Sequence, residues 1–175
     1  MKKIHEEIVY KGWRGIIQKR FELLDGTTAD FDIVDNGSYI SVAAFTAKQE
    51  VILVRQFRPG PEKMMVSFCE GYIDTGETPE QSARRELLEE TGYQVGEIHF
   101  LRRMHQAYST ETKHCFIATN CRQVAAQQLD ATENIDVFTV SLASFRAYLI
   151  DSSIDGFANT GLGYMALDFL QKLNF

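Results

Sequence analysis

The stretch that decides the fold is Gly71–Tyr93, which reads GYIDTGETPEQSARRELLEETGY. Its second half predicts a helix with well-defined ends. Thr78 suits the N-cap, Pro79 suits the first helical position, and Gln81 completes a capping box with Thr78. Gly92 lies where a left-handed residue commonly ends a helix. A glycine-rich, turn-prone segment therefore leads directly into a capped helix.

The predicted helix carries a cluster of acids. Three carboxylates share one face at positions i, i+3 and i+4: Glu86, Glu89 and Glu90. Leu88 is expected to point the opposite way, with Leu87 on the flank, so the apolar stripe is short. On these three acids alone, a solvated acidic face would be the simpler interpretation. The preceding loop adds Glu77 and free backbone carbonyls, and Mg²⁺ prefers such oxygen ligands. The whole stretch therefore favours a metal site.

The same stretch resembles the Nudix box, G-x5-E-x7-R-E-U-x-E-E-x-G-U, where U is bulky and apolar. The matching positions are Gly71, Glu77, Arg85, Glu86, Leu87, Glu89, Glu90, Gly92 and Tyr93. Tyr93 is aromatic where an aliphatic residue is usual. The chain is therefore identified as a member of the Nudix hydrolase superfamily. That resemblance implies hydrolysis of a nucleoside diphosphate linked to another group, with water and Mg²⁺ (or Mn²⁺).

Composition limits the other possibilities. A chain of 175 residues favours one domain, with or without a small appendage, and 45% hydrophobic residues are enough for a core. The net charge of −6 argues against a general binder of nucleic acid or membrane surfaces. It is compatible with a phosphorylated small molecule, because bound cations would invert the local field.

Cysteine usage and hydropathy indicate a cytoplasmic protein. The cysteines are odd in number and lack metal-site spacing, so neither a disulfide framework nor a zinc site is expected: Cys69, Cys115 and Cys121. The chain contains no apolar run of about 18 residues, so no membrane span is expected.

The first part of the chain reads as an antiparallel β appendage. Short strands are expected over residues 6–10, 15–23 and 30–34, with Leu24–Thr27 as a hairpin-type turn. We therefore divide the chain into an N-terminal β region, 1–37, and a hydrolase domain, 38–175.

The rest of the chain reads as mixed α and β. Strands are expected over residues 38–46, 50–56, 64–68, 94–104, 113–118 and 135–140, with a polar loop over 121–134. Helices are expected over 141–150 and 161–173, the second with one apolar side: Leu162, Met165, Ala166, Phe169 and Leu170. This order predicts an α+β protein, a mixed α/β/α sandwich with the Nudix fold.

Outer features resemble the ADP-ribose and nucleotide-sugar pyrophosphatase branch of the family. They are the N-terminal β segment, the run Arg55–Arg58, the acidic loop before Ile135, and the C-terminal segment from Ile154 through Leu167. In that branch the N-terminal sheet contacts a partner subunit. The resemblance therefore implies a homodimer that acts on a small-molecule nucleotide.

The resemblance also implies a metal-binding set. Glu86 and Glu90 are the first candidates for metal ligands, with Glu89 next and the backbone carbonyl of Glu70 as a further ligand. Arg85 is expected to orient a carboxylate, with Glu89 in reach at i+4. The alternative for Arg85 is a plain surface ion pair.

The general base remains open between two loop acids. The branch places this role on a glutamate before the last strand, which matches Glu133. Glu111 is the alternative, and either residue could instead be a solvated loop acid.

Four residues are candidates for binding substrate. Arg58 follows a β-run, precedes a Pro-Gly-Pro loop and suits phosphate, and Gln56 shares its strand face. Trp13 could stack on a base, or belong to a dimer interface or the core. Tyr108 raises the same question.

Three departures from the branch leave the substrate open. Ser67 replaces a glutamate, Glu70 replaces a small alanine, and Ala107-Tyr108 stand where a proline is common. ADP-ribose and other nucleoside diphosphate sugars both remain candidates. The alternative functions are hydrolysis of dinucleoside polyphosphates or nucleoside triphosphates, and non-catalytic sensing of a nucleotide sugar.

Overall fold

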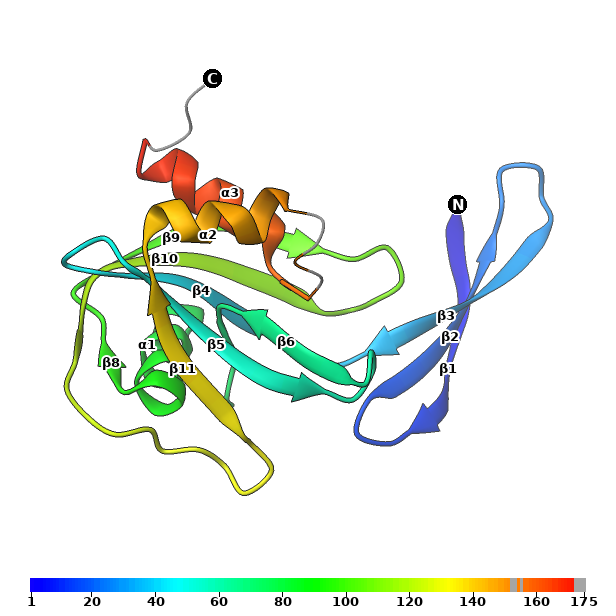
Figure 1. Ribbon diagram of the computed structural model, residues 1–175. Helices are drawn as coiled ribbons and strands as arrows, with labels where there is room; N and C mark the ends of the chain where they lie inside the picture. Colours follow the sequence, from blue (N-terminus) through cyan, green and yellow to red (C-terminus); the bar gives the residue numbers. More distant parts are fainter. Residues whose placement is uncertain (152–153, 155, 172–175) are drawn as a thin grey trace.

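The computed structural model describes residues 1–151, 154 and 156–171, and its strands form two sheets. The smaller sheet is antiparallel in the order β1-β2-β3 and stands out to one side of the body (Figure 1). Its strands are β1 (Lys2–Lys11), β2 (Gly15–Glu22) and β3 (Thr28–Asp35). The turn expected before β3 is present, because the Leu23 N–H donates to the Thr27 carbonyl at 2.8 Å.

The larger sheet has eight strands and is mixed. They are β4 (Tyr39–Thr46), β5 (Val51–Arg58), β6 (Lys63–Ser67), β7 (Cys69–Tyr72), β8 (Tyr93–Gln94), β9 (Glu97–His105), β10 (Thr112–Gln123) and β11 (Ile135–Val140). The order β11-β5-β4-β10-β8 runs through its centre, while β6 pairs with β5, β7 with β4 and β9 with β10. Only β4 and β10 pair in parallel among these strands.

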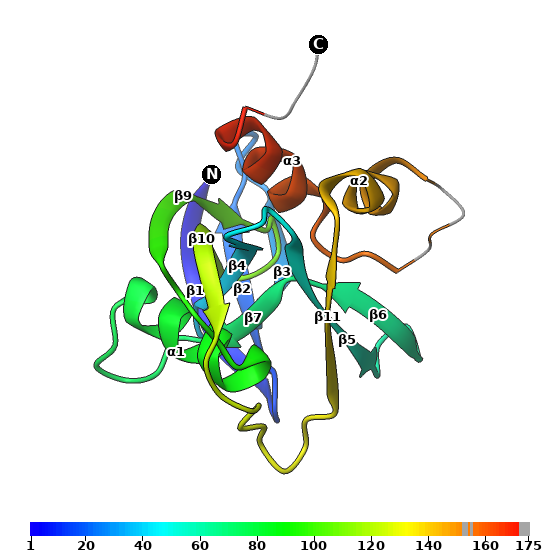
Figure 2. The same ribbon diagram turned by 60° about the vertical axis from the view of Figure 1, so that its left-hand side comes forward.

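Three helices cover the two faces of this sheet. They are α1 (Pro79–Thr91), α2 (Leu142–Ile150) and α3 (Thr160–Phe169). Helices α2 and α3 lie together above the sheet and α1 lies below it (Figures 1 and 2). The mixed α/β/α sandwich predicted from the sequence is therefore confirmed.

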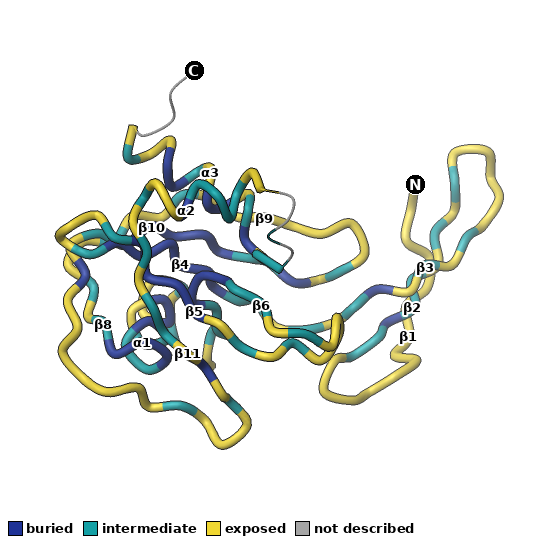
Figure 3. Tube along the Cα trace, viewed as in Figure 1, coloured by how far each residue is buried: buried dark blue, intermediate teal, exposed yellow. Residues whose placement is uncertain are grey.

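Each face of the sheet has its own apolar core. The buried residues gather in the larger sheet and its helices, whereas the smaller sheet is mostly exposed or intermediate (Figure 3). On the α2/α3 face, Phe68 packs against Phe145 with ring centroids 5.6 Å apart. On the α1 face, Ala83 and Leu87 pack against the sheet. Residues 51–54 of β5 are all buried, as their apolar run predicted, since alternate side chains feed the two cores.

The structure corrects several local expectations. Leu87 is fully buried while Leu88 is only partly buried, so the inward side of α1 is Leu87 rather than Leu88. Strand β10 continues to Gln123 because Arg122 and Gln123 pair with β8, so the polar loop begins later than expected. Strand β7 was not predicted as an element of its own. The helix expected over 161–173 ends at Phe169, and residues 172–173 lie outside the described part of the chain.

The smaller sheet is joined to the body near the β9–β10 loop. The Val34 N–H donates to the Tyr108 carbonyl at 3.0 Å, and the Thr110 N–H donates to the Val34 carbonyl at 2.9 Å. This junction brings the turn between β1 and β2 to the loop that carries Glu111, because Arg14 and Glu111 form an ion pair at 3.5 Å.

None of the helices in the described part of the chain combines the length and apolar character needed to cross a membrane. The three cysteines are buried and free.

Candidate active site

Helix α1 begins and ends as its sequence predicts. The Gln81 N–H donates to Thr78 Oγ1 at 3.3 Å, and the Thr78 N–H donates to Gln81 Oε1 at 2.8 Å. Gly92 has a φ of 74°, and its N–H donates to the Leu88 carbonyl. A Cβ at Gly92 would lie 2.2 Å from the Ala125 carbonyl oxygen, so glycine also allows the following loop to approach.

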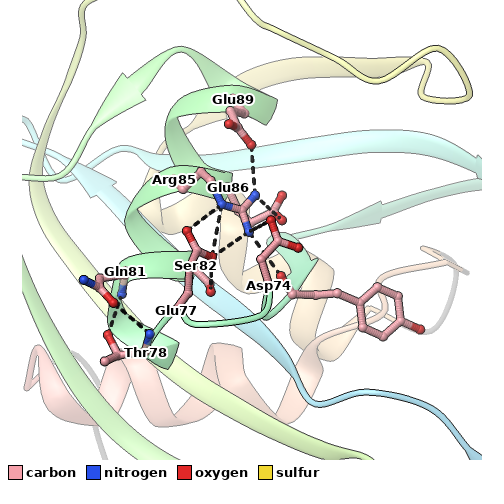
Figure 4. A network of polar contacts seen from close by, with 9 residues as sticks. Asp74, Glu77, Thr78, Gln81, Ser82, Arg85, Glu86 and Glu89 are labelled. Atoms are coloured by element: carbon pink, nitrogen blue, oxygen red, sulfur yellow. Dashed lines mark hydrogen bonds and ion pairs between the residues drawn. The ribbon is translucent and has the colours of Figure 1, made fainter.

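Arg85 lies at the centre of the acidic cluster (Figure 4). Its Nη1 donates to Glu86 at 2.8 Å and to Glu89 at 3.0 Å. Its Nε and Nη2 donate to Glu77, with Nη2 also 3.3 Å from the Tyr72 carbonyl. Nη2 also forms an ion pair with Asp74 at 3.4 Å. One guanidinium therefore contacts four carboxylates and a strand carbonyl, which is more than the single surface ion pair considered as the alternative.

Glu77 is held in its ionised form. The Arg85 guanidinium, followed by the Ser82 hydroxyl, lowers the pKa of Glu77 to about 2. The Ser82 hydroxyl donates to Glu77 at 2.6 Å. Glu77 thus fixes Arg85 and the start of α1.

Glu86 and Glu90 have the opposite electrostatics. Burial raises the pKa of Glu86 to about 7, although Arg85 opposes the shift. Burial also raises the pKa of Glu90 to about 8, with the charges of Glu86 and Glu133 adding to it and the Cys69 thiol opposing it. Glu90 is only 3% exposed, and its Oε2 is buried without a hydrogen-bond partner. Both acids are therefore poorly solvated in the absence of a cation.

Glycine at position 71 makes room for Glu86. A Cβ at Gly71 would lie 2.0 Å from the carboxyl carbon of Glu86. The Glu86 carboxylate therefore lies against the β7 backbone, next to Glu70. This close contact explains why the Glu86 side chain requires a glycine opposite it.

The residues present fit a divalent cation. Within the described residues, no three His, Cys, Asp or Glu side chains already converge as a preformed metal centre. A set of two carboxylates, Glu86 and Glu90, with the nearby Glu70 carbonyl and waters still matches what Mg²⁺ accepts. The unpartnered Glu90 oxygen supplies the strongest support, because buried acceptors are normally satisfied. Glu89 is more exposed and is held by Arg85.

The two candidate bases lie in different surroundings. The charge of Glu133 raises the pKa of both Glu86 and Glu90, so Glu133 lies near these carboxylates. Glu111 is 7% exposed, accepts a hydrogen bond from Ser109 at 3.2 Å and pairs with Arg14. This electrostatic effect makes Glu133, rather than Glu111, the candidate for a group that acts beside α1.

The loop that carries Glu133 is fastened to α1. Gln127 Nε2 donates to the Glu90 carbonyl at 2.7 Å and to the Ile135 carbonyl at 2.9 Å. The Gln128 N–H donates to the Glu89 carbonyl at 2.8 Å. Sequence reasoning missed Gln127, because a glutamine in a polar loop gives no signal of such contacts.

Arg58 and Gln56 lie together, as their shared strand face predicted. The Gln56 amide oxygen, when turned toward Arg58, accepts from its guanidinium at 3.0 Å. Arg58 Nη2 lies 3.8 Å from Glu70 Oε2. Glu70 also binds two residues that the sequence did not single out, Lys113 and Asn159. The sequence signal that could have pointed to Lys113 is its positive charge at the start of a predicted strand that is otherwise mostly apolar.

The two aromatic candidates belong to the junction between the sheets. Trp13 lies in the turn between β1 and β2 and is 87% exposed, so the alternative of a core residue is wrong. Tyr108 is exposed too, and its ring centroid lies 6.4 Å from that of Phe31.

Comparison with known families agrees with this geometry. The family profile of the NUDIX domain matches residues 36–154, which include α1 and all of the acids discussed above. The chain belongs to the Nudix family. The family assigned from the sequence is therefore confirmed, and with it the class of enzyme, a Nudix pyrophosphohydrolase.

Three relatives of similar sequence carry different names. An ADP-ribose pyrophosphatase of Bacillus subtilis (strain 168) is 32% identical over 124 residues, 69% of this chain and 67% of the relative. A GDP-mannose pyrophosphatase of Klebsiella pneumoniae is 34% identical over 128 residues, 66% of this chain and 64% of the relative. A methanol dehydrogenase activator of Bacillus methanolicus is 29% identical over 136 residues, 76% and 74% of the two chains.

The fold of this Nudix protein matches a solved structure over nearly its whole length. The crystal structure of an ADP compounds hydrolase superposes with a TM-score of 0.85 and covers 99% of this chain and 98% of that one. The sequences are 20% identical. The likeness therefore concerns the fold, including the N-terminal sheet.

Proposed function

We propose that this Nudix enzyme cleaves the diphosphate of ADP-ribose or another nucleoside diphosphate sugar with Mg²⁺, releasing a nucleoside monophosphate and a sugar phosphate. The names of relatives at 32% and 34% identity support this substrate class. The observation that carries the proposal is the buried, unpartnered oxygen of Glu90 beside Glu86. These acids suit a cation-dependent reaction of an anionic substrate.

Glu86, Glu90 and the Glu70 carbonyl are the residues that would hold the cation. Bound there, Mg²⁺ supplies positive charge that neutralises and orients the diphosphate. Arg85 positions Glu86 and Glu89 through the hydrogen bonds described above. It acts on the ligands and does not need to touch the substrate.

Glu133 is the proposed general base. It accepts a proton from a water whose oxygen attacks one phosphorus, and the bond from that phosphorus to the bridging oxygen breaks. The bridging oxygen leaves with the other phosphate. Arg58, at the end of β5, would pair with a phosphate oxygen, since a guanidinium offers several donors to such a group. Gln56 supports Arg58.

We further propose that the enzyme is a cytoplasmic homodimer. All ten residues of β1 are exposed, including Ile4, Ile8 and Tyr10, which is unusual for apolar side chains of a sheet. A partner subunit on the N-terminal region, 1–37, would bury them and could also cover Trp13, leaving 38–175 as the hydrolase domain. Free cysteines suit a reducing compartment.

Product analysis tests the proposed reaction. The purified protein with Mg²⁺ is incubated with ADP-ribose, GDP-mannose and other nucleoside diphosphate sugars, and with ATP and a dinucleoside polyphosphate. We expect nucleoside monophosphate and sugar phosphate from at least one sugar substrate, and no turnover by Glu90→Gln. Turnover of ATP or the dinucleotide alone would instead assign the polyphosphate alternative. A folded protein that turns over no compound would overturn the proposal.

A further inference from the structure

A second polar feature lies beside the proposed cation site. A cavity of about 290 Å³, here called the Glu70 pocket, includes Tyr39, Glu70, His105, Glu111, Lys113 and Asn159 in its lining. It gathers residues from β4, β7, β9, β10, the β9–β10 loop and the segment before α3. Gly71, the first residue of the Nudix box, directly follows Glu70 and is therefore the box residue next to this pocket.

The Glu70 side chain is held in place by two hydrogen-bond donors and a longer ion pair. Lys113 Nζ lies 2.6 Å from Glu70 Oε1, and Asn159 Nδ2 lies 2.7 Å from the same oxygen. Asn159 is in turn fixed, because its Oδ1 accepts from the Phe68 N–H at 2.8 Å. Arg58 approaches the second oxygen, Oε2, at 3.8 Å. That oxygen has the looser partner and is the one able to accept from a ligand.

The charges of the pocket do not suit a phosphate. Lys113 is already paired with Glu70, and Arg14 is paired with Glu111. A phosphate that entered would face two carboxylates whose cations are engaged, and like charges at close range repel. Carboxylates are instead strong acceptors for hydroxyl groups. The pocket therefore suits an uncharged ligand rich in hydroxyls.

The pocket also adjoins the proposed diphosphate site. Glu70 precedes Gly71, and the Glu86 carboxylate lies directly against Gly71. Arg58, the proposed phosphate partner, contacts the Glu70 carboxylate as well. A ring attached to a diphosphate held at Glu86 and Glu90 is therefore placed to reach the pocket.

We propose that the Glu70 pocket binds a sugar ring of the substrate through its neighbouring hydroxyls, with Glu70 and Glu111 as acceptors. Acidic side chains bind the hydroxyls of ribose in other nucleotide sites in the same way. The inference rests on the proposed function and names Glu70 as a residue that determines specificity. The ring is either the nucleoside ribose or the sugar beyond the diphosphate, and both carry the same chemistry.

Equilibrium binding of three uncleavable ligands separates these sources. The ligands are α,β-methylene ADP-ribose, α,β-methylene ADP, and the 2′,3′-dideoxy form of α,β-methylene ADP. Calorimetric titration in Mg²⁺ compares the wild type with Glu70→Ala, Glu70→Gln and Glu111→Gln. Loss of hydrogen bonds to a charged group predicts weakening by about 10- to 100-fold for Glu70→Ala. Glu70→Gln keeps the volume and is the variant to use if Glu70→Ala fails to fold.

The pattern across ligands gives the answer. If the Glu70 variants bind only the ADP-ribose analogue more weakly than the wild type does, the pocket is assigned to the sugar beyond the diphosphate. If the variants bind the ADP-ribose and ADP analogues equally more weakly, and bind the dideoxy form as the wild type does, the pocket is assigned to the nucleoside ribose. No weakening in the folded Glu70 variants, or equal weakening for all three ligands, overturns the inference.

A control separates this inference from the proposed function. The control is Glu97→Ala, which also removes one carboxylate charge, but from an exposed side chain that contacts Asn120 and His99. The Glu97→Ala protein should bind all three ligands with wild-type affinity. If the wild type turns over nucleoside diphosphate sugars while the Glu70 variants keep wild-type binding, the pocket assignment alone fails. If the wild type turns over none and binds none, the proposed function fails.

Discussion

Glu90 is an acid held where its ionised form is poorly solvated. Its pKa is raised from 4.5 to about 8 by burial first, and one of its oxygens has no hydrogen-bond partner. A folded protein that binds this proton more tightly than the unfolded chain loses stability as pH rises from 4.5 to about 8. Glu90 therefore destabilises the cation-free protein at neutral pH, as residues of a binding site commonly do.

We predict that Glu90→Gln stabilises the cation-free protein at pH 8 by about 1–3 kcal/mol, because it removes the buried charge but leaves an amide to satisfy. The gain should shrink as pH falls toward 4.5 and vanish below it, where the wild-type acid becomes protonated in both states. Urea unfolding in EDTA measures both values. Added Mg²⁺ should then stabilise the wild type and not the variant. A variant that is less stable at pH 8 would contradict this account of Glu90.

Glu77 gives a prediction of the opposite sign. Because Arg85 and Ser82 lower its pKa from 4.5 to about 2, its contribution to stability is complete above pH 4.5 and is lost as pH falls toward 2. Glu77→Gln should lower the melting temperature at pH 7 and reduce the loss of stability between pH 4.5 and 2. Glu80→Gln is the matched control, since Glu80 forms an exposed ion pair with Arg84 and should change little. Equal effects of the two substitutions would show that Arg85 does not hold Glu77 in solution.

At the scale of the element, α1 was predictable because its signals are local. Thr78, Gln81 and Gly92 act on backbone groups within a turn of themselves, so their spacing alone predicts both ends. Strand β7 was not predictable in the same way, since its pairing partner is β4, far away in sequence. Which side of α1 is buried also depends on the sheet that the helix packs against. The sequence therefore predicted Leu88 at the centre of the buried side, where the structure has Leu87.

Gly92 connects the helix to the loop of the proposed base. Gly92→Ala should destabilise the protein by more than about 1 kcal/mol, because the left-handed conformation and the 2.2 Å approach of the Ala125 carbonyl both oppose a Cβ. Gly76→Ala is the control: Gly76 has a φ of 91° but no atom within 4 Å of the added Cβ. Urea unfolding compares the two. A larger loss for Gly76→Ala would show that the loop does not pack on Gly92.

At the scale of the whole molecule, the sequence marks the candidate metal ligands but not the residues that surround them. The Nudix box marks Glu86 and Glu90 because their spacing is fixed within one helix. The Glu70 contacts with Lys113 and Asn159 join three distant segments and become visible only in the folded chain. The proximity of Glu133 to α1 likewise depends on loop contacts such as those of Gln127.

The exposed β1 strand makes a prediction about assembly. Sedimentation equilibrium should give a mass near twice 19.9 kDa, since a partner would bury the apolar side chains of the N-terminal sheet. Ile8→Asp, on the exposed strand, should shift the protein toward the monomer, whereas Thr139→Asp on β11 should not. A fully active wild-type monomer would remove the proposed role of the N-terminal sheet in assembly.

The most direct test of the account is a crystal structure of the protein with Mg²⁺ and α,β-methylene ADP-ribose. The account predicts a cation bound by the carboxylates of Glu86 and Glu90, with the diphosphate of the analogue on its other side. A cation and diphosphate bound elsewhere, with these two carboxylates contacting neither, would contradict it.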